Sequence, residues 1–297
     1  GTSNFRAGVN AGNSIASGGN YNVVVGDEAG TAISTGDSNV AMGYGALSTE
    51  DTSGLNVAVG YRALLSQNGD TADTYNIAVG ADAGQQISTG NRNVLVGSLS
   101  GFGITGADGN TAFGHNTLST NAGSELNVAV GFDALKTLNI GSGSGYNTAV
   151  GGGAGGAITT GLYNTIVGGL AGDALTDADS NVAIGVSALS ADTLGSQSVA
   201  VGTNALTTQN LTTATTTYNT AVGSNAGYAV TTGTQNALIG GLAGDSLTDA
   251  DYNVAIGTAA LDADTLGSRS VAIGHITLSA QNFTTATDSY NTAVGYG

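Results

Sequence analysis

The chain contains no cysteine, no proline and no tryptophan, and its aromatic residues are limited to 11 tyrosines and 5 phenylalanines. The absence of cysteine excludes a disulfide framework. A compact domain of 297 residues needs large side chains to fill a thick core, whereas the hydrophobic residues here are mostly alanine and valine. The composition therefore favours a thin, repetitive β-structure over a globule.

Positive charge is also scarce. Five lysines and arginines stand against 21 acidic residues, which gives a formal net charge of −16. This balance lacks the basic surface that a nucleic-acid partner requires. No apolar run approaches the ~20 residues of a membrane span, and the start of the chain shows no signal-peptide pattern. We therefore expect no nucleic-acid partner and no membrane span.

The chain is instead highly repetitive and rich in glycine, with 50 glycines in all. The pentapeptide at 147–151, Asn-Thr-Ala-Val-Gly, returns with small substitutions along the whole chain, and a disordered linker would have no reason to keep such a register. Eleven of the sixteen steps between copies are 17 residues long, a period typical of a solenoid. The first residue of each copy, Asn or Ser, falls at positions 4, 22, 39, 56, 76, 93, 110, 127, 147, 164, 181, 198, 219, 236, 253, 270 and 291.

A second period lies above the first, because every fourth step is longer. The chain is thus built of blocks of four coils, 71 or 72 residues each, and residues 168–223 match residues 240–295 at 41 of 56 positions. We predict a single continuous array over residues 1–297. Neither end resembles a cap, so we expect the array to extend further or its ends to be covered by partners.

Each pentapeptide predicts a short strand. In Val57-Ala58-Val59, β-branched residues alternate with alanine, and the glycine that follows allows the chain to turn a corner. A second apolar piece about six residues later, such as Ala157-Ile158, predicts a second strand in each coil. No apolar stripe with helical spacing is long enough for a helix. The fold class is therefore all-β, a parallel β-solenoid with coils of about 17 residues.

Stacking such coils would place the first residues of the pentapeptides above one another, where their side-chain amides can form a hydrogen-bonded ladder. Val and Ile at the second and fourth pentapeptide positions would form apolar columns. The core of one coil is too slender to offset the ordering entropy of seventeen residues. We therefore expect strand faces to be buried between chains, most simply in a homotrimer.

The segments Ser198–Gly202 and Ser270–Gly274 resemble the Ser-Val-Ala-Ile-Gly repeats in the heads of YadA-type trimeric autotransporter adhesins. The segments Asn147–Ala154 and Asn219–Ala226 are similar to the Asn-Thr-Ala-Val-Gly repeats of phage tail fibres. These resemblances imply a trimer of parallel β-rolls, located at a cell surface, outside the cell or on a virion tail. The coil is longer than that of the adhesin heads, and residues 1–297 themselves contain no pattern typical of a coiled-coil stalk or a chaperone domain.

Two glycine-rich segments, Gly151–Gly156 and Gly101–Gly106, match the dinucleotide-binding pattern G-x-G-x-x-G. No helix is expected after either, so no helix N-terminus would meet a pyrophosphate. We interpret both as corners of a coil and predict no cofactor.

The Asp-x-Asp-x-Asn runs at 177–181 and 249–253 imitate the start of a calcium loop. The later positions lack the required glycine and acid, which excludes an EF-hand. A surface calcium clip between turns, helped by Asp173 or Asp245, stays open beside the alternative of solvated turn carboxylates. We therefore assign no residue to a metal site.

His115 and His275 follow pentapeptides in different kinds of coil, and neither has the neighbours of a hydrolase triad. We therefore predict no catalytic residue. A pair of carboxylates that cleaves glycosides between chains stays open as an enzyme alternative.

The long turns at 207–213 and 279–285 occur once per four coils and are the best place for recognition. Asn210 and Asn282 begin N-glycosylation sequons, which matter in a secretory host. Threonine-rich faces suggest ice binding, although threonine does not recur at one place in every coil. The long turns end in tyrosines, which could stack on sugars or pack over the flank: Tyr75, Tyr146, Tyr218 and Tyr290.

Together these features predict a non-enzymatic fibre, a rigid extracellular or virion rod for attachment and spacing. Its partners would be its own copies, in a homotrimer or an end-to-end filament, and a host surface glycan or receptor. The alternatives are a self-assembling extracellular filament subunit and a spike-type glycan-degrading enzyme.

Overall fold

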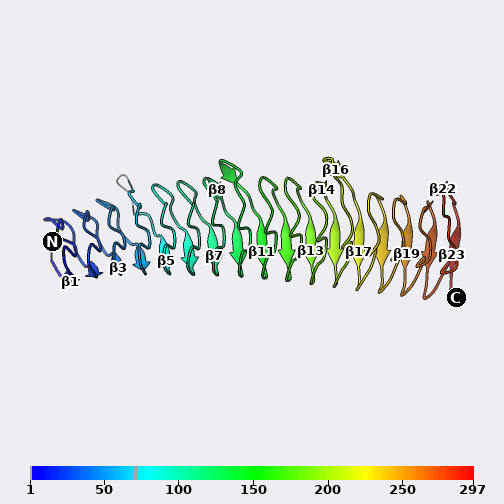
Figure 1. The fold of residues 1–297 in the computed structure, drawn as a ribbon, viewed down its shortest axis with the longest axis horizontal. Helices are drawn as coiled ribbons and strands as arrows, with labels where there is room; N and C mark the ends of the chain where they lie inside the picture. Colours follow the sequence, from blue (N-terminus) through cyan, green and yellow to red (C-terminus); the bar gives the residue numbers. More distant parts are fainter. Residues whose placement is uncertain (1, 70–72) are drawn as a thin grey trace. The chain divides into compact units, whose positions relative to one another are not determined.

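The computed structural model describes residues 2–69 and 73–297, and it contains no helix within those ranges. The chain is an all-β parallel β-solenoid with a coil about every 17 residues, as the repeat predicts (Figure 1). Its internal contacts divide it into two compact units, residues 1–146 and residues 147–297.

In the described part of the first unit, eight three-residue strands pair in parallel and without any shift in register. A separate pair, β8 (Ser124–Glu125) and β10 (Gly143–Ser144), forms a small parallel sheet. The eight strands are β1 (Phe5–Ala7), β2 (Val23–Val25), β3 (Val40–Met42), β4 (Val57–Val59), β5 (Ile77–Val79), β6 (Val94–Val96), β7 (Thr111–Phe113) and β9 (Val128–Val130).

The second unit repeats this plan with nine such strands. Two small sheets pair β14 (Gly195–Ser196) with β16 (Thr215–Thr216) and β20 (Gly267–Ser268) with β22 (Thr287–Asp288). The nine strands are β11 (Thr148–Val150), β12 (Thr165–Val167), β13 (Val182–Ile184), β15 (Val199–Val201), β17 (Thr220–Val222), β18 (Ala237–Ile239), β19 (Val254–Ile256), β21 (Val271–Ile273) and β23 (Thr292–Val294).

The prediction of a second strand in every coil is wrong. Residues 157–158, for example, lie in a turn, where Ile158 N–H donates to the carbonyl of Gly155 in its own coil at 3.1 Å. Ala157 and Thr159 N–H donate to the next coil. Successive N–H groups of a parallel strand face opposite neighbours, so Ile158 N–H would donate to the preceding coil if it were in a strand, and the local turn bond takes this donor instead.

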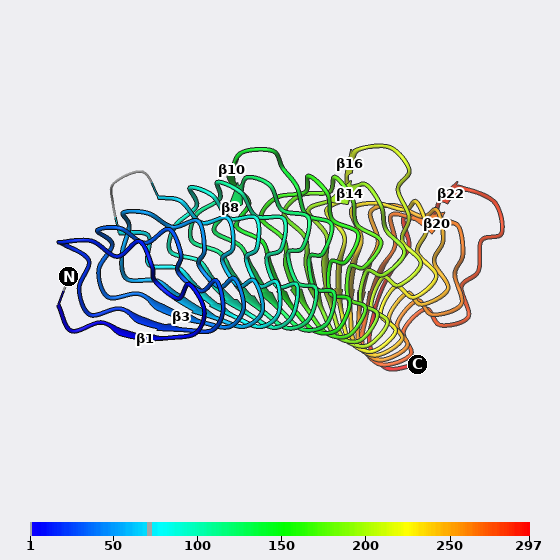
Figure 2. The same cartoon turned by 60° about the vertical axis from the view of Figure 1, so that its left-hand side comes forward.

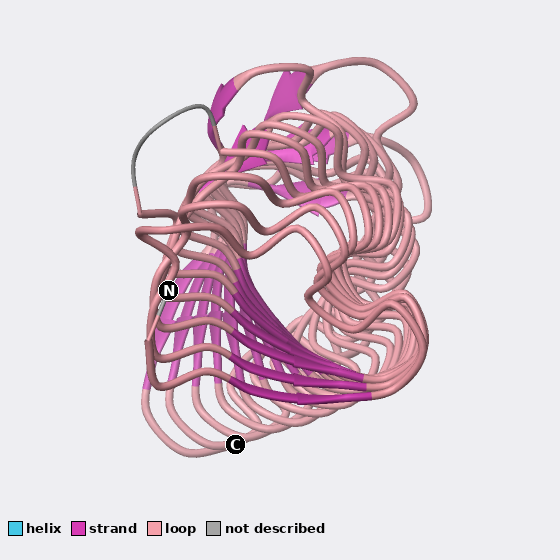
Figure 3. Cartoon of the chain, turned by 90° about the vertical axis from the view of Figure 1, so that its left-hand side faces the viewer, coloured by secondary structure: helices cyan, strands magenta, loops and turns pink. Residues whose placement is uncertain are grey.

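Within each unit the three-residue strands follow one side of the coils, and the small sheets lie across the coil from them (Figure 3). The longest connections of the coil protrude beside these small sheets, near the labels β10, β16 and β22 (Figure 2). They belong to the fourth coil of each block, where the sequence has its extra residues.

The predicted ladder is present, but its main donor is the backbone. Within each unit, the Oδ1 of a ladder asparagine accepts a hydrogen bond from the main-chain N–H of the ladder residue in the next coil of that unit, at 2.8–3.0 Å. Side-chain amides donate along the ladder only in some coils, as from Asn93 to Asn76 at 3.1 Å. Asparagine is suited to this place because one amide offers both an acceptor and a donor.

The same amide also closes its own coil. Asn164 Nδ2 donates to the carbonyl of Ala178, fourteen residues further on, at 2.8 Å, and Asn236 Nδ2 does the same to Ala250 at 2.7 Å. Where serine replaces asparagine, a glutamine supplies the missing groups. Gln209 Nε2 donates to Ser198 Oγ at 2.8 Å, and its Oε1 accepts from Asn219 Nδ2 at 2.8 Å.

Core packing explains the block of four. We number positions within a coil from the ladder residue, which is position 0. In the first two coils of a block, position +8 is glycine and position +11 is Ile, Leu or Val, as in Gly172 and Leu175. In the last two coils, position +8 is leucine and position +11 is polar in all but one case, as in Leu189 and Asp192. A Cβ at Gly172 would lie 2.9 Å from Leu175 Cδ1, so the two positions share one volume.

Candidate interaction surface: the outer face of the parallel sheet

Except in the first and last strands, β1 and β23, each three-residue strand has one buried side chain and two outward ones. In these strands position +2 is Ala, Val, Leu or Ile and is fully buried, as in Ala183 and Leu238. Positions +1 and +3 point away from the core because side chains alternate along a strand. We call the side chains at +1 and +3 the sheet face of each unit.

The sheet face is apolar and open to solvent. No residue on it is fully buried, and the isoleucines at position +3 of the second unit, such as Ile184, Ile239 and Ile256, are 36–39% exposed. In the first unit, Met42 and Phe113 at the same position are 43% and 56% exposed. The expected apolar columns are therefore present, and they form an uncovered surface in both units.

The sheet face also carries no charge. Every residue at +1 and +3 in the described coils is Val, Ile, Thr, Ala, Phe or Met. The 21 acidic side chains of the chain lie elsewhere in the coils. A charge-free apolar stripe on a chain with a net charge of −16 is the kind of surface that marks a protein–protein contact.

Three stacked pairs of aromatic rings lie at position +5, at one border of the sheet face. Tyr44 and Tyr61 stack with ring centroids 5.7 Å apart in consecutive coils. The two histidines take the same place, because His115 stacks on Phe132 at 5.5 Å and His275 on Tyr296 at 5.3 Å. Each histidine is therefore one ring in a stack, with another aromatic ring from the next coil as its neighbour.

The other border, at position −1, is a column of residues in the left-handed backbone region, many of them tyrosine. The tyrosines that end the long turns lie here, and Tyr75, Tyr146, Tyr218 and Tyr290 are 49–68% exposed. In the same column the Arg269 guanidinium carbon lies 4.5 Å from the ring centroid of Tyr252. Its Nε also pairs with the carboxylate of Asp288 at 3.0 Å.

The calcium-like runs are parts of the coil. Asp179 Oδ1 accepts from the backbone N–H of Leu162 at 2.7 Å, and Asp177 Oδ1 accepts from Thr160 Oγ1 at 2.6 Å. The third residue of the run, Asn181, is a fully buried ladder asparagine. The run at 249–253 has the same arrangement. Among the described residues, no three His, Asp or Glu side chains gather as a metal-binding group.

Three other turn aspartates differ from this pattern. Asp173, Asp245 and Asp262 each have one carboxylate oxygen that is buried without a hydrogen-bond partner in the described structure. Burial raises the pKa of the Asp173 carboxyl above its usual value. Burial, and next the negative charge of Asp262 in the neighbouring coil, raise the pKa of the Asp245 carboxyl. The Asp173 and Asp245 carboxyls are therefore easier to protonate than free aspartates.

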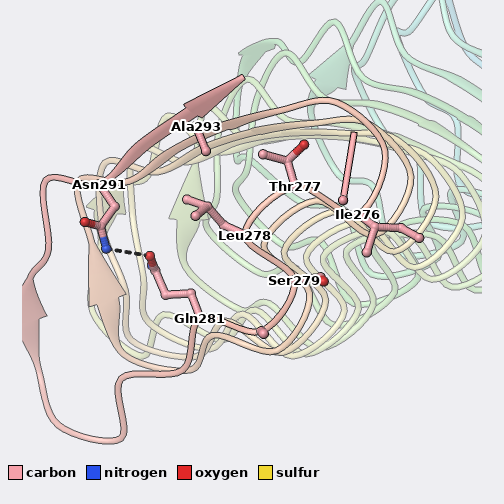
Figure 4. A pocket seen from close by; sticks show the side chains of 9 residues that line it. Ile276, Thr277, Leu278, Ser279, Gln281, Asn291 and Ala293 are labelled. Carbon is pink, nitrogen blue, oxygen red and sulfur yellow. Dashed lines mark hydrogen bonds between the residues drawn. The ribbon is translucent and has the colours of Figure 1, made fainter. Parts of the chain in front are cut away.

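A hollow of about 460 Å³ lies at the last coil (Figure 4). Gln281 and Asn291 meet at its edge through a 2.7 Å hydrogen bond. No carboxylate, histidine or lysine is among the residues that line it, so it offers no acid–base pair. They are Ile276, Thr277, Leu278, Ser279, Ala280, Gln281, Asn291, Ala293 and Gly297.

The glycine-rich segments that match the dinucleotide pattern also lie in coil corners. Gly151 ends β11 and Gly101 occupies position +8 of its coil, each with positive φ. Turns follow both segments instead of a helix. Nothing in either place provides the helix N-terminus that holds a pyrophosphate.

The apolar columns of the sheet face were predicted from the pentapeptides, whereas their lack of charge was not. Once the coils are aligned on the ladder residue, the columns at +1 and +3 are free of Asp, Glu, Lys and Arg in every coil.

In the part of the chain that the structure describes, no helix has the length and hydrophobicity to cross a membrane. No family model, curated protein or solved structure matches the chain.

Proposed function

We propose that the chain is a non-enzymatic structural and adhesive fibre protein that works as an assembly of its own copies outside the cell or on a virion. The observation that carries the proposal is the uncovered, charge-free sheet face in each unit. Burying apolar surface of this kind is the main favourable contribution to protein association.

A second copy is a suitable partner for this face. Its columns repeat once per coil, at the ~4.8 Å spacing of paired strands, so another copy offers the same spacing along the contact. Two negatively charged copies would repel each other over most of their surface, and the sheet face is where that repulsion is least. The resemblance to trimeric adhesin heads and tail-fibre repeats supports three copies.

The absence of convergent catalytic groups in the described residues favours a structural role over catalysis. The two histidines stack on aromatic rings, and the aspartates of the calcium-like runs, such as Asp177 and Asp179, accept hydrogen bonds from neighbouring coils. Exposed tyrosines and the protruding long turns are the parts best placed to contact a host glycan or receptor.

The test is the solution mass of the full chain, measured by light scattering over a hundredfold range of concentration, together with negative-stain images. We expect a mass three times that of the 28.7 kDa chain and discrete particles. A stable monomer would contradict the proposal. Long filaments would favour end-to-end assembly, and shortened products after incubation with polysaccharide would favour the glycan-degrading alternative.

A further inference from the structure

The two N-glycosylation sequons of the chain occupy equivalent places in the second unit. The sequence has 27 asparagines, and only Asn210 and Asn282 have serine or threonine two residues later, namely Thr212 and Thr284. Both asparagines lie at position +12 of a fourth coil, at the base of the protruding turn. Both are exposed.

The asparagine side chain is held by its oxygen, which leaves its nitrogen open. Asn210 Oδ1 accepts from Thr193 Oγ1 at 3.2 Å, and Asn282 Oδ1 accepts from Thr265 Oγ1 at 3.2 Å. Within the described residues, neither Nδ2 donates a hydrogen bond to the protein. The nitrogen that carries an N-linked glycan is therefore the free end of each amide.

The second residue of each sequon is held by the coil, and the third residue is exposed to solvent. Leu211 is 6% exposed, and its N–H donates to the buried carboxylate of Asp192 at 3.0 Å. Phe283 N–H makes the same bond to Asp264 at 2.9 Å. The next residues, Thr212 and Thr284, are exposed and begin the protruding turn. A glycan on either asparagine would project into solvent without disturbing the core.

We propose that Asn210 and Asn282 are acceptor sites for N-linked glycosylation, an inference that rests on the proposed location outside the cell. Their Nδ2 attacks the anomeric carbon of an oligosaccharide carried on a lipid diphosphate. The new C–N bond forms as the bond from that carbon to the diphosphate oxygen breaks. The lipid diphosphate leaves with the electron pair, and the nitrogen gives up one proton to the transferase.

The position of these sites agrees with assembly through the sheet face. The protruding turns of the second unit lie across the coil from its three-residue strands (Figure 3). Glycans at both sites would cover the side with the small sheets and leave the sheet face free. The chain also offers internal controls, because Asn68 and Asn139 occupy the same coil position but have Asp70 and Gly141 two residues later.

The experiment is secretion of the full chain from a eukaryotic host, followed by intact mass measurement before and after treatment with peptide N-glycosidase. We expect two glycans per chain, with the carrier asparagines converted to aspartate by the glycosidase. T212V should remove one glycan and T284V the other, and N210Q and N282Q should do the same. Asn68 and Asn139 should stay unmodified.

Secreted, folded protein without glycans would overturn the inference, as would glycans that persist in the double variant T212V/T284V. Self-association is measured separately on protein made in a host that does not glycosylate. Secreted protein from the eukaryotic host that assembles but carries no glycan would overturn only the glycosylation sites. Glycosylated protein that stays monomeric, whether or not its glycans are removed, would overturn only the proposed assembly.

Discussion

At the scale of single residues, the fold depends on backbone conformations that most side chains avoid. Three places in each coil, at −1, +6 and +8, lie in the left-handed region, and most of them are not glycine. Leucine fills +8 in the last two coils of a block, as in Leu189 (φ 54°) and Leu206 (φ 49°). Such a residue costs about 1 kcal/mol or more relative to glycine, and its fully buried side chain offsets that cost.

The glycine that ends each strand permits no such exchange. Gly168 has φ 139°, and an added Cβ would lie 2.6 Å from the carbonyl carbon of Gly185 in the next coil. Its neighbour Gly169 has open space around the same point and no strained φ. We expect G168A to lower stability by about 2 kcal/mol or more. We expect G169A to change stability by no more than about 0.5 kcal/mol.

Thermal and denaturant unfolding, monitored by circular dichroism, would give the stability of both variants and so compare two adjacent positions in one corner of the coil. Equal effects would show that the close contact between glycines of successive coils does not limit the sequence. A large effect at Gly169 alone would contradict the stacking geometry at this corner.

The Asp245 carboxyl gives a residue-scale prediction about pH. Its pKa in the folded chain is raised above 3.8, so ionisation costs the folded state more than the unfolded state. The destabilisation is absent at low pH, where both states are protonated, and grows as the pH rises through the raised pKa. D245N removes it, so the variant should gain stability relative to the wild type as pH rises from about 3 to about 7.

The measurement is the unfolding midpoint of both proteins at each pH, because their difference cancels effects of the net charge. D177N is the matched control, since Asp177 is exposed and bonded to Thr160. A difference between D245N and wild type that stays constant with pH would refute the assignment.

At the scale of elements, a buried carboxylate fastens each long turn of the second unit. Asp192 is fully buried and accepts from the N–H groups of Gly195 at 3.1 Å and Leu211 at 3.0 Å, and from Gln209 Nε2 at 2.6 Å. Three donors in one place compensate the cost of burying a charge. The element they fix is the base of the turn between β14 and β16.

Another block of the chain has a different pair of residues at these two positions. The preceding block has Asn121 and Leu138 where this one has Asp192 and Gln209. We expect D192N and Q209L each to cost about 1–3 kcal/mol, since each leaves a buried polar group without its partner. The double variant should cost less than the sum, with a coupling of about 0.5–3 kcal/mol.

The coupling is measured in a double-mutant cycle, which compares the unfolding midpoints of the wild type, the two single variants and the double variant. The same cycle at Asp264 and Gln281, which have the same bonds, serves as a replicate. Strict additivity at both places would show that the carboxylate and the glutamine act independently.

These elements also show which parts of the fold could be predicted from the sequence. The period of 17 placed every three-residue strand and every ladder asparagine, because register in a solenoid follows directly from spacing. It did not reveal that Ala157-Ile158 is a turn, because an apolar pair has the same appearance in a short strand and in a buried corner. It also gave no sign of the left-handed backbone, since leucine and tyrosine rarely adopt it.

The candidate site was less predictable for a related reason. Alternation in a pentapeptide shows that Val182 and Ile184 share a face, but only the three-dimensional coil shows that nothing covers that face. The column of threonines at +12 was likewise missed because it is confined to the second unit, whereas the first unit has mostly other residues at that position. Thr159, Thr176 and Thr193 occupy it in successive coils, followed by Asn210.

At the scale of the whole molecule, the proposed assembly depends on the sheet face and makes a prediction that a charge can test. Ile239 and Ile256 lie at +3 of consecutive coils, 39% and 36% exposed. Lysine tolerates such a half-exposed strand position by extending its amine into solvent. In an assembly, I239K/I256K would bury two unpaired charges per copy in an apolar contact, which is strongly unfavourable.

We expect I239K/I256K to be folded and monomeric at concentrations where the wild type is an oligomer. The control T159K/T231K adds the same charge at two exposed positions outside the strands, both at +12 of their coils, and it should leave the oligomer intact. Light scattering gives the masses, and circular dichroism verifies that both variants keep the wild-type fold. If the sheet-face variant assembles as the wild type does, copies meet through another surface. If both variants dissociate, the added positive charge alone is responsible, and the apolar contact loses its support.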